Sequence, residues 1–137
     1  MSKPVLIALD WGSTRFRGWL LDANGQVLGS FDKELGILKI KDSSFSYIFE
    51  KILKTWFKDH GRLPVIASGM IGSLQGWVEA PYVATPAGPD EFAEHTNIVS
   101  TLLKIFLSNL SDIKLNFIYF TFFCFLGLFL KYVLTIL

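Results

Sequence analysis

The chain has 137 residues, enough for one ordinary domain with at most a short appendage. Thirteen basic and 12 acidic side chains give a formal net charge of +1, and no basic block is interleaved with aromatic residues, so nucleic acid is excluded as an expected partner. The single cysteine, Cys124, excludes an intrachain disulfide framework and a cysteine-rich zinc site.

The first predicted element is a strand over residues 5–9. Its sequence, Val-Leu-Ile-Ala-Leu, is too short for a free-standing helix and rich in branched side chains, as in a strand buried on both faces. The residue that follows, Asp10, would then lie at the rim of a sheet. Because this apolar run is also too short for a secretory signal, we expect a cytoplasmic protein.

The segment from Asp10 to Arg15 has the composition of a phosphate-binding turn. Gly12 permits a tight reversal, and Gly12, Ser13 and Thr14 can direct backbone N–H groups and hydroxyls toward one point. A carboxylate at Asp10 could hold Mg²⁺ beside that point, directly or through its waters. The plainer interpretation is a β-hairpin in which the aspartate and the glycine serve only the turn.

Two further strands are predicted over residues 15–22 and 26–31, because an Asn24-Gly25 hairpin signal separates them. A strand, a phosphate-suited hairpin and a second hairpin resemble the opening of the actin-like ATPase superfamily, which includes the sugar kinases. That resemblance implies an α/β fold of the ribonuclease H-like type, with a mixed sheet, opening β-hairpins and crossover helices. The chain contains no Gly-x-x-x-x-Gly-Lys-Ser/Thr sequence, so it does not resemble a P-loop protein.

A short strand over residues 37–40 and then an amphipathic helix are predicted next. Asp42 or Ser43 would cap this helix, and Gly61 would end it, with Pro64 shortly after. Its apolar residues recur at helical spacing, with charged residues on much of the opposite face. The apolar set is Phe45, Ile48, Phe49, Ile52, Leu53, Trp56 and Phe57.

A fourth strand over residues 63–67 is predicted to run parallel to the first, because a helix of this length allows a crossover between them. It leads into a second turn of small residues, from Ser68 to Ser73. Ligands gather outside the carboxyl ends of parallel strands. Both turns are therefore expected at one edge of the sheet.

Residues 68–82 complete a resemblance to one family, 2-dehydro-3-deoxygalactonokinase. The shared motifs are Asp-Trp-Gly-Ser-Thr-x-x-Arg at residues 10–17 and Gly-Met-x-Gly-Ser-x-x-Gly-Trp-x-x-x-Pro-Tyr at residues 69–82, and the likeness runs from about Pro4 to about Ala87. It implies transfer of the γ-phosphoryl group of ATP, with Mg²⁺, to the terminal hydroxyl of 2-dehydro-3-deoxy-D-galactonate. Nothing in the residue spacing distinguishes galactonate from gluconate derivatives.

The resemblance also implies roles for individual residues. Asp10 would organise the Mg²⁺ ion, through its waters. The phosphates would be lined by Gly12, Ser13, Thr14 and Arg15. The sugar acid would be bordered by Arg17, Gly69, Met70, Gly72, Ser73 and Trp77.

Family members are longer and have a second domain, which completes the adenosine site and is expected to supply the general base. We therefore expect the 137-residue chain alone to have little or no kinase activity. One alternative is a membrane-anchored nucleotide- or sugar-binding remnant without catalysis. Another is a product that does not fold stably.

The composition changes near residue 113, so residues 1–112 are assigned to the kinase-like part and residues 113–137 to a hydrophobic tail. Before this boundary, Pro89 and Asp90 can open a helix whose apolar stripe is Phe92, Val99, Leu103, Phe106 and Leu110. Residues 115–130 carry no charge and are predicted to form a hydrophobic helix that crosses or associates with a membrane. The competing interpretation is a truncated or frame-shifted gene product, because AT-rich DNA read in an unintended frame encodes such residues.

Overall fold

Three antiparallel strands begin the chain and confirm the predicted double hairpin. They are β1 (Pro4–Trp11), β2 (Phe16–Asp22) and β3 (Val27–Lys33). The Asn24-Gly25 turn connects β2 and β3. Gly25 has φ of 74°, and its amide donates to the Asp22 carbonyl at 3.0 Å. This computed structural model describes residues 2–40, 44–82, 84, 88, 94–95, 97–99 and 118–121.

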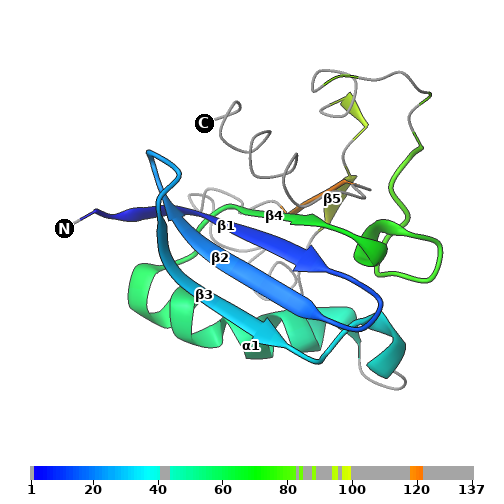
Figure 1. Cartoon of the computed structure of the whole chain (residues 1–137), viewed down its shortest axis with the longest axis horizontal. Coiled ribbons are helices and arrows are strands. Elements are labelled where there is room, and N and C mark those ends of the chain that lie inside the picture. The colour runs from blue at the N-terminus through cyan, green and yellow to red at the C-terminus, as the bar shows by residue number, and fades with distance from the viewer. Residues whose placement is uncertain are drawn as a thin grey trace, which may run out of the picture.

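The described strands form one six-stranded sheet in the order β3-β2-β1-β4-β6-β5 (Figure 1). Strand β4 (Val65–Ser68) pairs parallel to β1, as predicted from the helix between them. Strand β6 (Ile118–Thr121) runs parallel to β4, and β5 (Asn97–Val99) pairs antiparallel to β6. The sheet is therefore mixed, and the fold class is α/β.

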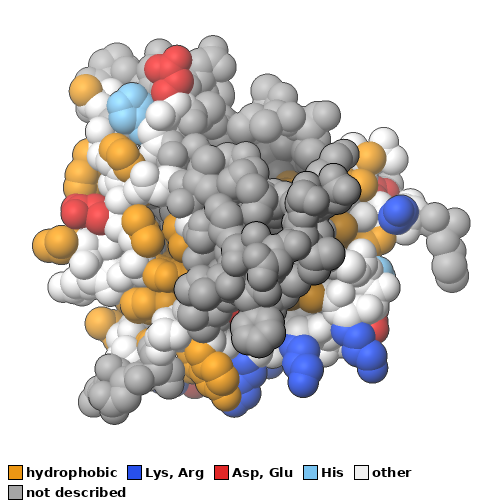
Figure 2. Space-filling view, turned by 180° about the vertical axis from the view of Figure 1, so that it is seen from behind, with side chains coloured by type: hydrophobic (Ala, Val, Ile, Leu, Met, Phe, Trp, Pro, Cys, Tyr) orange, Lys and Arg blue, Asp and Glu red, His pale blue; other side chains and the backbone are white. Residues whose placement is uncertain are grey.

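Helix α1 (Phe45–His60) covers one face of the sheet (Figure 1). Its N-cap is Ser44, whose hydroxyl accepts a hydrogen bond from the Tyr47 amide at 3.2 Å, so the predicted caps, Asp42 and Ser43, are wrong. The predicted end at Gly61 is confirmed. In Figure 2, Lys and Arg side chains gather along the lower edge of the molecule, the edge along which α1 runs in Figure 1.

Alternate residues of β1 face opposite sides of the sheet. Ile7, Leu9 and Trp11 are fully buried in the core cluster that α1 completes with Phe49 and Leu53. The intervening residues, Leu6 and Ala8, face the other side of the sheet. There they pack with Leu21 and Ile66 of the neighbouring strands in a second, smaller cluster. Because side chains alternate along a strand, Asp10 lies on the face away from α1.

Trp11 anchors the end of β1 in the core, on the opposite face from Asp10. Its ring stacks on Phe16 with centroids 3.9 Å apart, and its indole N–H donates to the Leu35 carbonyl at 2.9 Å. A buried aromatic ring with a satisfied polar tip fixes the backbone around it. The position of the neighbouring carboxylate is therefore set by core packing.

The strand predicted over residues 37–40 is wrong, because Ile37–Lys39 form a 3₁₀ helix, η1. The amides of residues 36–38 donate to the loop between β1 and β2 and not to a strand ladder. Ile37 is buried in the core, while Leu38 is exposed. The apolar composition of this segment reflects the packing of Ile37 in the core, with Ile40 partly buried against it, and not the pairing of a strand.

The two helices predicted near the end of the chain are wrong over residues 97–99 and 118–121, where the structure has strands. Residue 94 is helical, but residues 97–99, which include Val99 of the predicted apolar stripe, form strand β5. Residues 89–93, 96 and 100–110 lie outside the described residues. Residues 118–121 form strand β6 in place of part of the hydrophobic helix, and the remainder of 113–137 lies outside the described residues. Among the described residues, no helix has the length and apolarity needed to cross a membrane.

The physical reason lies in the position of β6. It pairs with β4 on one edge and β5 on the other, so its backbone hydrogen bonds lie inside the sheet. A strand with neighbours on both sides, in a sheet that is covered on both faces, has an uncharged and apolar sequence, as a membrane helix does. The absence of charge over residues 115–130 therefore did not distinguish the two.

Candidate functional site

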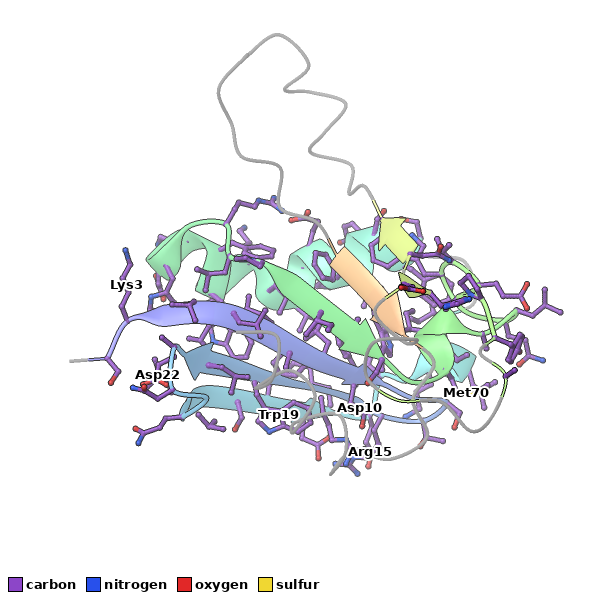
Figure 3. The ribbon with its side chains drawn as sticks, turned by 90° about the horizontal axis from the view of Figure 1, so that it is seen from above. Lys3, Asp10, Arg15, Trp19, Asp22 and Met70 are labelled. Atoms are coloured by element: carbon purple, nitrogen blue, oxygen red, sulfur yellow. The ribbon has the colours of Figure 1, made fainter. Side chains whose placement is uncertain are left out.

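A row of polar residues crosses four neighbouring strands near the end of the sheet. The backbone register places Asp10 of β1 opposite Arg17 of β2 and Ser68 of β4, and it places Arg17 opposite Asp32 of β3. Paired residues share a face, so this polar row (Asp32, Arg17, Asp10 and Ser68) lies on the face away from α1. Figure 3 shows Asp10 and Met70 toward the end of the sheet opposite Lys3 and Asp22.

The Asp10 carboxylate is held by an ion pair within this row. Oδ2 of Asp10 accepts a hydrogen bond from Nη2 of Arg17, and the two side chains are 15% and 37% exposed. Among the described residues, the buried Nε of Arg17 has no hydrogen-bond partner. The pair fixes one carboxylate oxygen and leaves the other, Oδ1, directed at the neighbouring turn.

Gly69 approaches that second oxygen closely. A Cβ added at Gly69 would lie 3.0 Å from Oδ1 of Asp10 and 2.9 Å from the Trp11 carbonyl oxygen. The residue also has φ of 98° and ψ of −158°, a conformation that is essentially restricted to glycine. Both the backbone and the space therefore require glycine beside Asp10.

A second ion pair stands at the outer end of the row. Nε of Arg15 donates to Oδ1 of Asp32 at 2.8 Å, with both side chains about half exposed. This hydrogen bond holds the pKa of Asp32 below its usual range and raises the pKa of Arg15. Exposed pairs contribute little to stability. Its effect is to fix the guanidinium at the end of the loop between β1 and β2.

That loop, residues 12–15, is held by backbone hydrogen bonds, one within the loop and three from the segment after β3. The Gly12 amide donates to the Arg15 carbonyl at 2.9 Å, so the turn itself uses this amide. The carbonyl oxygens of Gly12, Ser13 and Thr14 accept hydrogen bonds at 3.0–3.1 Å from the amides of residues 36–38. Thr14 is exposed and Ser13 is half-buried, so the loop lies at the surface of the molecule.

The turn after β4 folds back onto the core. The hydroxyl of Ser73 donates to the Met70 carbonyl at 2.7 Å, and the amide of Gly72 donates to the Gly69 carbonyl at 3.1 Å, around the 3₁₀ helix η2 (Met70–Gly72). Ile71 is fully buried. The turn is therefore a rigid boundary on one side of Asp10.

Comparison with known proteins places these residues in a described family. The family model of 2-keto-3-deoxy-galactonokinase matches residues 10–114. The chain belongs to this family. The match begins at Asp10 and includes the loop, the polar row and the turn after β4.

Two curated relatives carry the name 2-dehydro-3-deoxygalactonokinase or are assigned to that activity. The one from Escherichia coli (strain K12) is 36% identical over 59% of this chain, and the one from Rhizobium meliloti (strain 1021) is 36% identical over 63%. These matches span 27% and 28% of the relatives' own lengths. The chain thus corresponds to little more than a quarter of each relative.

A solved structure has the same fold. It is the crystal structure of a protein from Sinorhizobium meliloti assigned as a 2-dehydro-3-deoxygalactonokinase, with a TM-score of 0.67 and 28% sequence identity. The similarity covers 85% of this chain and 35% of that structure.

The described part of this family member does not bring every predicted site residue to one place. Asp10, Arg17 and Gly69 lie together, with the loop of residues 12–15 beside them. Trp77, in contrast, packs its ring against Phe49 of α1, with centroids 5.7 Å apart. Its contact is thus with the α1 side of the sheet, the face opposite the polar row.

The residues around Asp10 fit a magnesium ion that is shared with a phosphate. Within the described ranges, no group of three or more His, Cys, Asp or Glu side chains could enclose a metal. Mg²⁺ commonly keeps several waters and binds one or two carboxylates together with substrate phosphates. A single fixed carboxylate next to a loop of amides and hydroxyls matches that donor set.

Sequence reasoning missed two residues of this site. Asp32, which pairs with Arg15, was not expected because an acidic residue after a strand is common at the surface. Gly36 was also missed, although it lies against the loop. The available signal was a glycine within a polar connection, which by itself indicates only a turn.

Proposed function

We propose that the chain provides the phosphate and magnesium side of the active site of an actin-like sugar-acid kinase. The reaction is ATP-dependent phosphorylation of 2-dehydro-3-deoxy-D-galactonate at its terminal hydroxyl. The observation that carries the proposal is the fixed Asp10 carboxylate beside the loop of residues 12–15. Family membership and the likeness to the Sinorhizobium meliloti structure support it.

In this proposal, Asp10 organises Mg²⁺ through its waters, with its orientation kept by Arg17. The phosphates of ATP lie along the loop, against Gly12, Ser13 and Thr14, with Arg15 at its end. Guanidinium groups and backbone amides stabilise the charge of phosphoryl oxygens, and positioning accounts for most of the catalysis in phosphoryl transfer.

The sugar acid is proposed to lie across the turn after β4. Its border is Arg17, Gly69, Met70, Gly72 and Ser73. Support comes from the short distance between Gly69 and Asp10, which brings the two turns together. Trp77 is proposed to support this border from the core side, where its ring contacts Phe49.

We further propose that the 137-residue chain binds Mg-ATP but turns it over little or not at all on its own. The matches cover 27% and 28% of the relatives, and closure of two domains is the step that excludes water in kinases of this kind. A cytoplasmic location is proposed, as for other metabolic kinases. The membrane-anchored alternative is not favoured, since residues 118–121 form a strand of the sheet.

A coupled ADP-release assay combined with calorimetry tests the proposal. The purified chain, Asp10→Ala and the control Asp59→Ala are compared, because Asp59 is an exposed carboxylate on α1. We expect Mg-dependent ATP binding in the wild type and in Asp59→Ala, a loss of at least about tenfold in Asp10→Ala, and no appreciable turnover in any of them.

Two results would contradict parts of this proposal. Equal Mg-ATP binding by the wild type and Asp10→Ala would refute the metal role of Asp10. Turnover of 2-dehydro-3-deoxy-D-galactonate by the wild type that disappears in Asp10→Ala would refute the inactivity of the chain and leave the assigned reaction standing.

A further inference from the structure

The segment after β3 holds the loop between β1 and β2 from one side. Three consecutive amides of this segment donate to three consecutive carbonyl oxygens of the loop. We call residues 36–38 the backing segment. Its hydrogen bonds are Gly36 to Thr14 at 3.0 Å, Ile37 to Gly12 at 3.0 Å and Leu38 to Ser13 at 3.1 Å.

These bonds determine where the loop amides point. In a trans peptide unit the carbonyl oxygen and the next residue's N–H lie on opposite sides of the chain. The carbonyl oxygens of residues 12–14 point at the backing segment, so the amides of Ser13, Thr14 and Arg15 point away from it. The Gly12 amide is the exception, because it donates to the Arg15 carbonyl within the turn.

Gly36 makes this arrangement sterically possible. A Cβ at Gly36 would lie 2.3 Å from the carbonyl carbon and oxygen of Ser13 and 2.3 Å from the nitrogen of Thr14. These are backbone atoms, which cannot rotate away as a flexible side chain can. Gly36 has φ of −70° and ψ of 171°, which any residue adopts, so close contact alone requires glycine here.

We propose that Gly36 is a positioning residue that makes the loop a one-sided surface of hydrogen-bond donors. The backing segment takes the acceptors, and the outward amides of Ser13, Thr14 and Arg15 bind the terminal phosphates of a nucleoside triphosphate. This inference rests on the proposed function and adds to it the element that orients the phosphate loop. It also moves the phosphate contact from the Gly12 amide to the Arg15 amide.

The ligand chemistry follows from the donors. Successive amides that converge on one side form a concave anion site, and the exposed hydroxyl of Thr14 adds a further donor. Hydrogen bonds to charged oxygens are about twice as strong as neutral ones. A triphosphate is therefore favoured over an uncharged sugar at this loop.

The first test uses the unmodified chain. Inorganic tripolyphosphate is titrated into the ¹⁵N-labelled protein while amide resonances are followed, so that no adenosine contact is needed. We expect the amides of Ser13, Thr14 and Arg15 to shift, while that of Gly12 stays within the scatter of residues far from the loop. Shifts centred on Gly12, with none at the other three amides, would overturn the inferred orientation.

The second test removes the close contact. Gly36→Ala is compared with Gly29→Ala, a matched glycine on β3 whose added Cβ meets only side-chain atoms at 3.8 Å and beyond. We expect Gly36→Ala to weaken tripolyphosphate binding by at least about tenfold while amides of α1 and β4 keep their wild-type shifts. Gly29→Ala should bind as the wild type does.

The outcomes separate the inference from the proposed function. Binding by Gly36→Ala within about twofold of the wild type would overturn the positioning role and leave the phosphate site standing. No binding of tripolyphosphate by the wild type would refute the phosphate site, and the inference with it. If Gly36→Ala does not fold, the titration of the wild type still decides the orientation.

Discussion

Replacing Gly69 with alanine is expected to destabilise the chain more than the same replacement at Gly61. The two glycines have similar backbone conformations, with φ of 98° and ψ of −158° at Gly69 and φ of 76° and ψ of −175° at Gly61. They differ in their surroundings. An added Cβ at Gly61 meets nothing within 4 Å, whereas at Gly69 it would lie 2.9 Å from the Trp11 carbonyl oxygen and 3.0 Å from Oδ1 of Asp10.

The two variants thus separate backbone strain from steric overlap. A side chain held in this region of φ and ψ costs about 1–3 kcal/mol, and this cost applies to both positions. Overlap with the Asp10 carboxylate and the Trp11 carbonyl adds about 1–3 kcal/mol at Gly69 alone. With a urea dependence of about 2 kcal/mol per molar, the added cost lowers the midpoint by a further 0.5–1.5 M or so.

Urea unfolding followed by tryptophan fluorescence measures both variants and the wild type. Gly29→Ala serves as the reference for an alanine without strain or overlap, since its Cβ meets its neighbours at ordinary contact distance. Equal midpoints for Gly61→Ala and Gly69→Ala would refute the argument that overlap with the Trp11 carbonyl and the Asp10 carboxylate excludes a side chain at Gly69.

Two further predictions concern charged groups. The side chains of Arg17 and Asp10 are 37% and 15% exposed, so solvent screens their ion pair only in part. A double-mutant cycle with Arg17→Met and Asp10→Asn should give a coupling free energy of about 1 kcal/mol in urea unfolding. A coupling under about 0.3 kcal/mol would contradict their pairing. The Asp22 carboxylate accepts amide hydrogen bonds from Gln26 and Asn24, which lower its pKa. The contribution of Asp22 to stability is therefore present above the unfolded pKa of about 3.9 and is lost as pH falls through the lower folded pKa. The Tm difference between wild type and Asp22→Ala should be largest near pH 7 and shrink below about pH 4. A Tm difference independent of pH would contradict this role of the carboxylate.

The elements that sequence predicted well are those whose signals are local. The double hairpin followed from the apolar run before Asp10 and from Asn24-Gly25, and α1 followed from its periodic apolar residues. The parallel pairing of β4 followed from chain connectivity. The meeting of the two turns at one sheet edge could therefore be predicted before any coordinates.

The elements predicted wrongly depend on partners distant in the sequence. Residues 37–39 form a 3₁₀ helix and not a strand because the amides of residues 36–38 bond to the loop of residues 12–14, which no local pattern reports. Residues 118–121 form a strand because β4 and β5 lie on either side. The same holds within the site, where the role of Gly36 is set by a contact with Ser13 across the fold.

The sheet order also has a consequence for how the chain folds. The contact between Asp10 and Arg17 joins residues 7 positions apart, whereas the contact between Ser68 and Leu9 joins residues 59 positions apart. Closing the longer loop costs about 2 kcal/mol more in chain entropy. The hairpins can therefore form early, and the insertion of β4 beside β1 comes later. Gly69 reaches Asp10 only after that insertion, so the site is completed in one of the last steps of folding. A folding intermediate that lacks the β4 insertion would therefore have the ion pair between Asp10 and Arg17 but not the turn beside it.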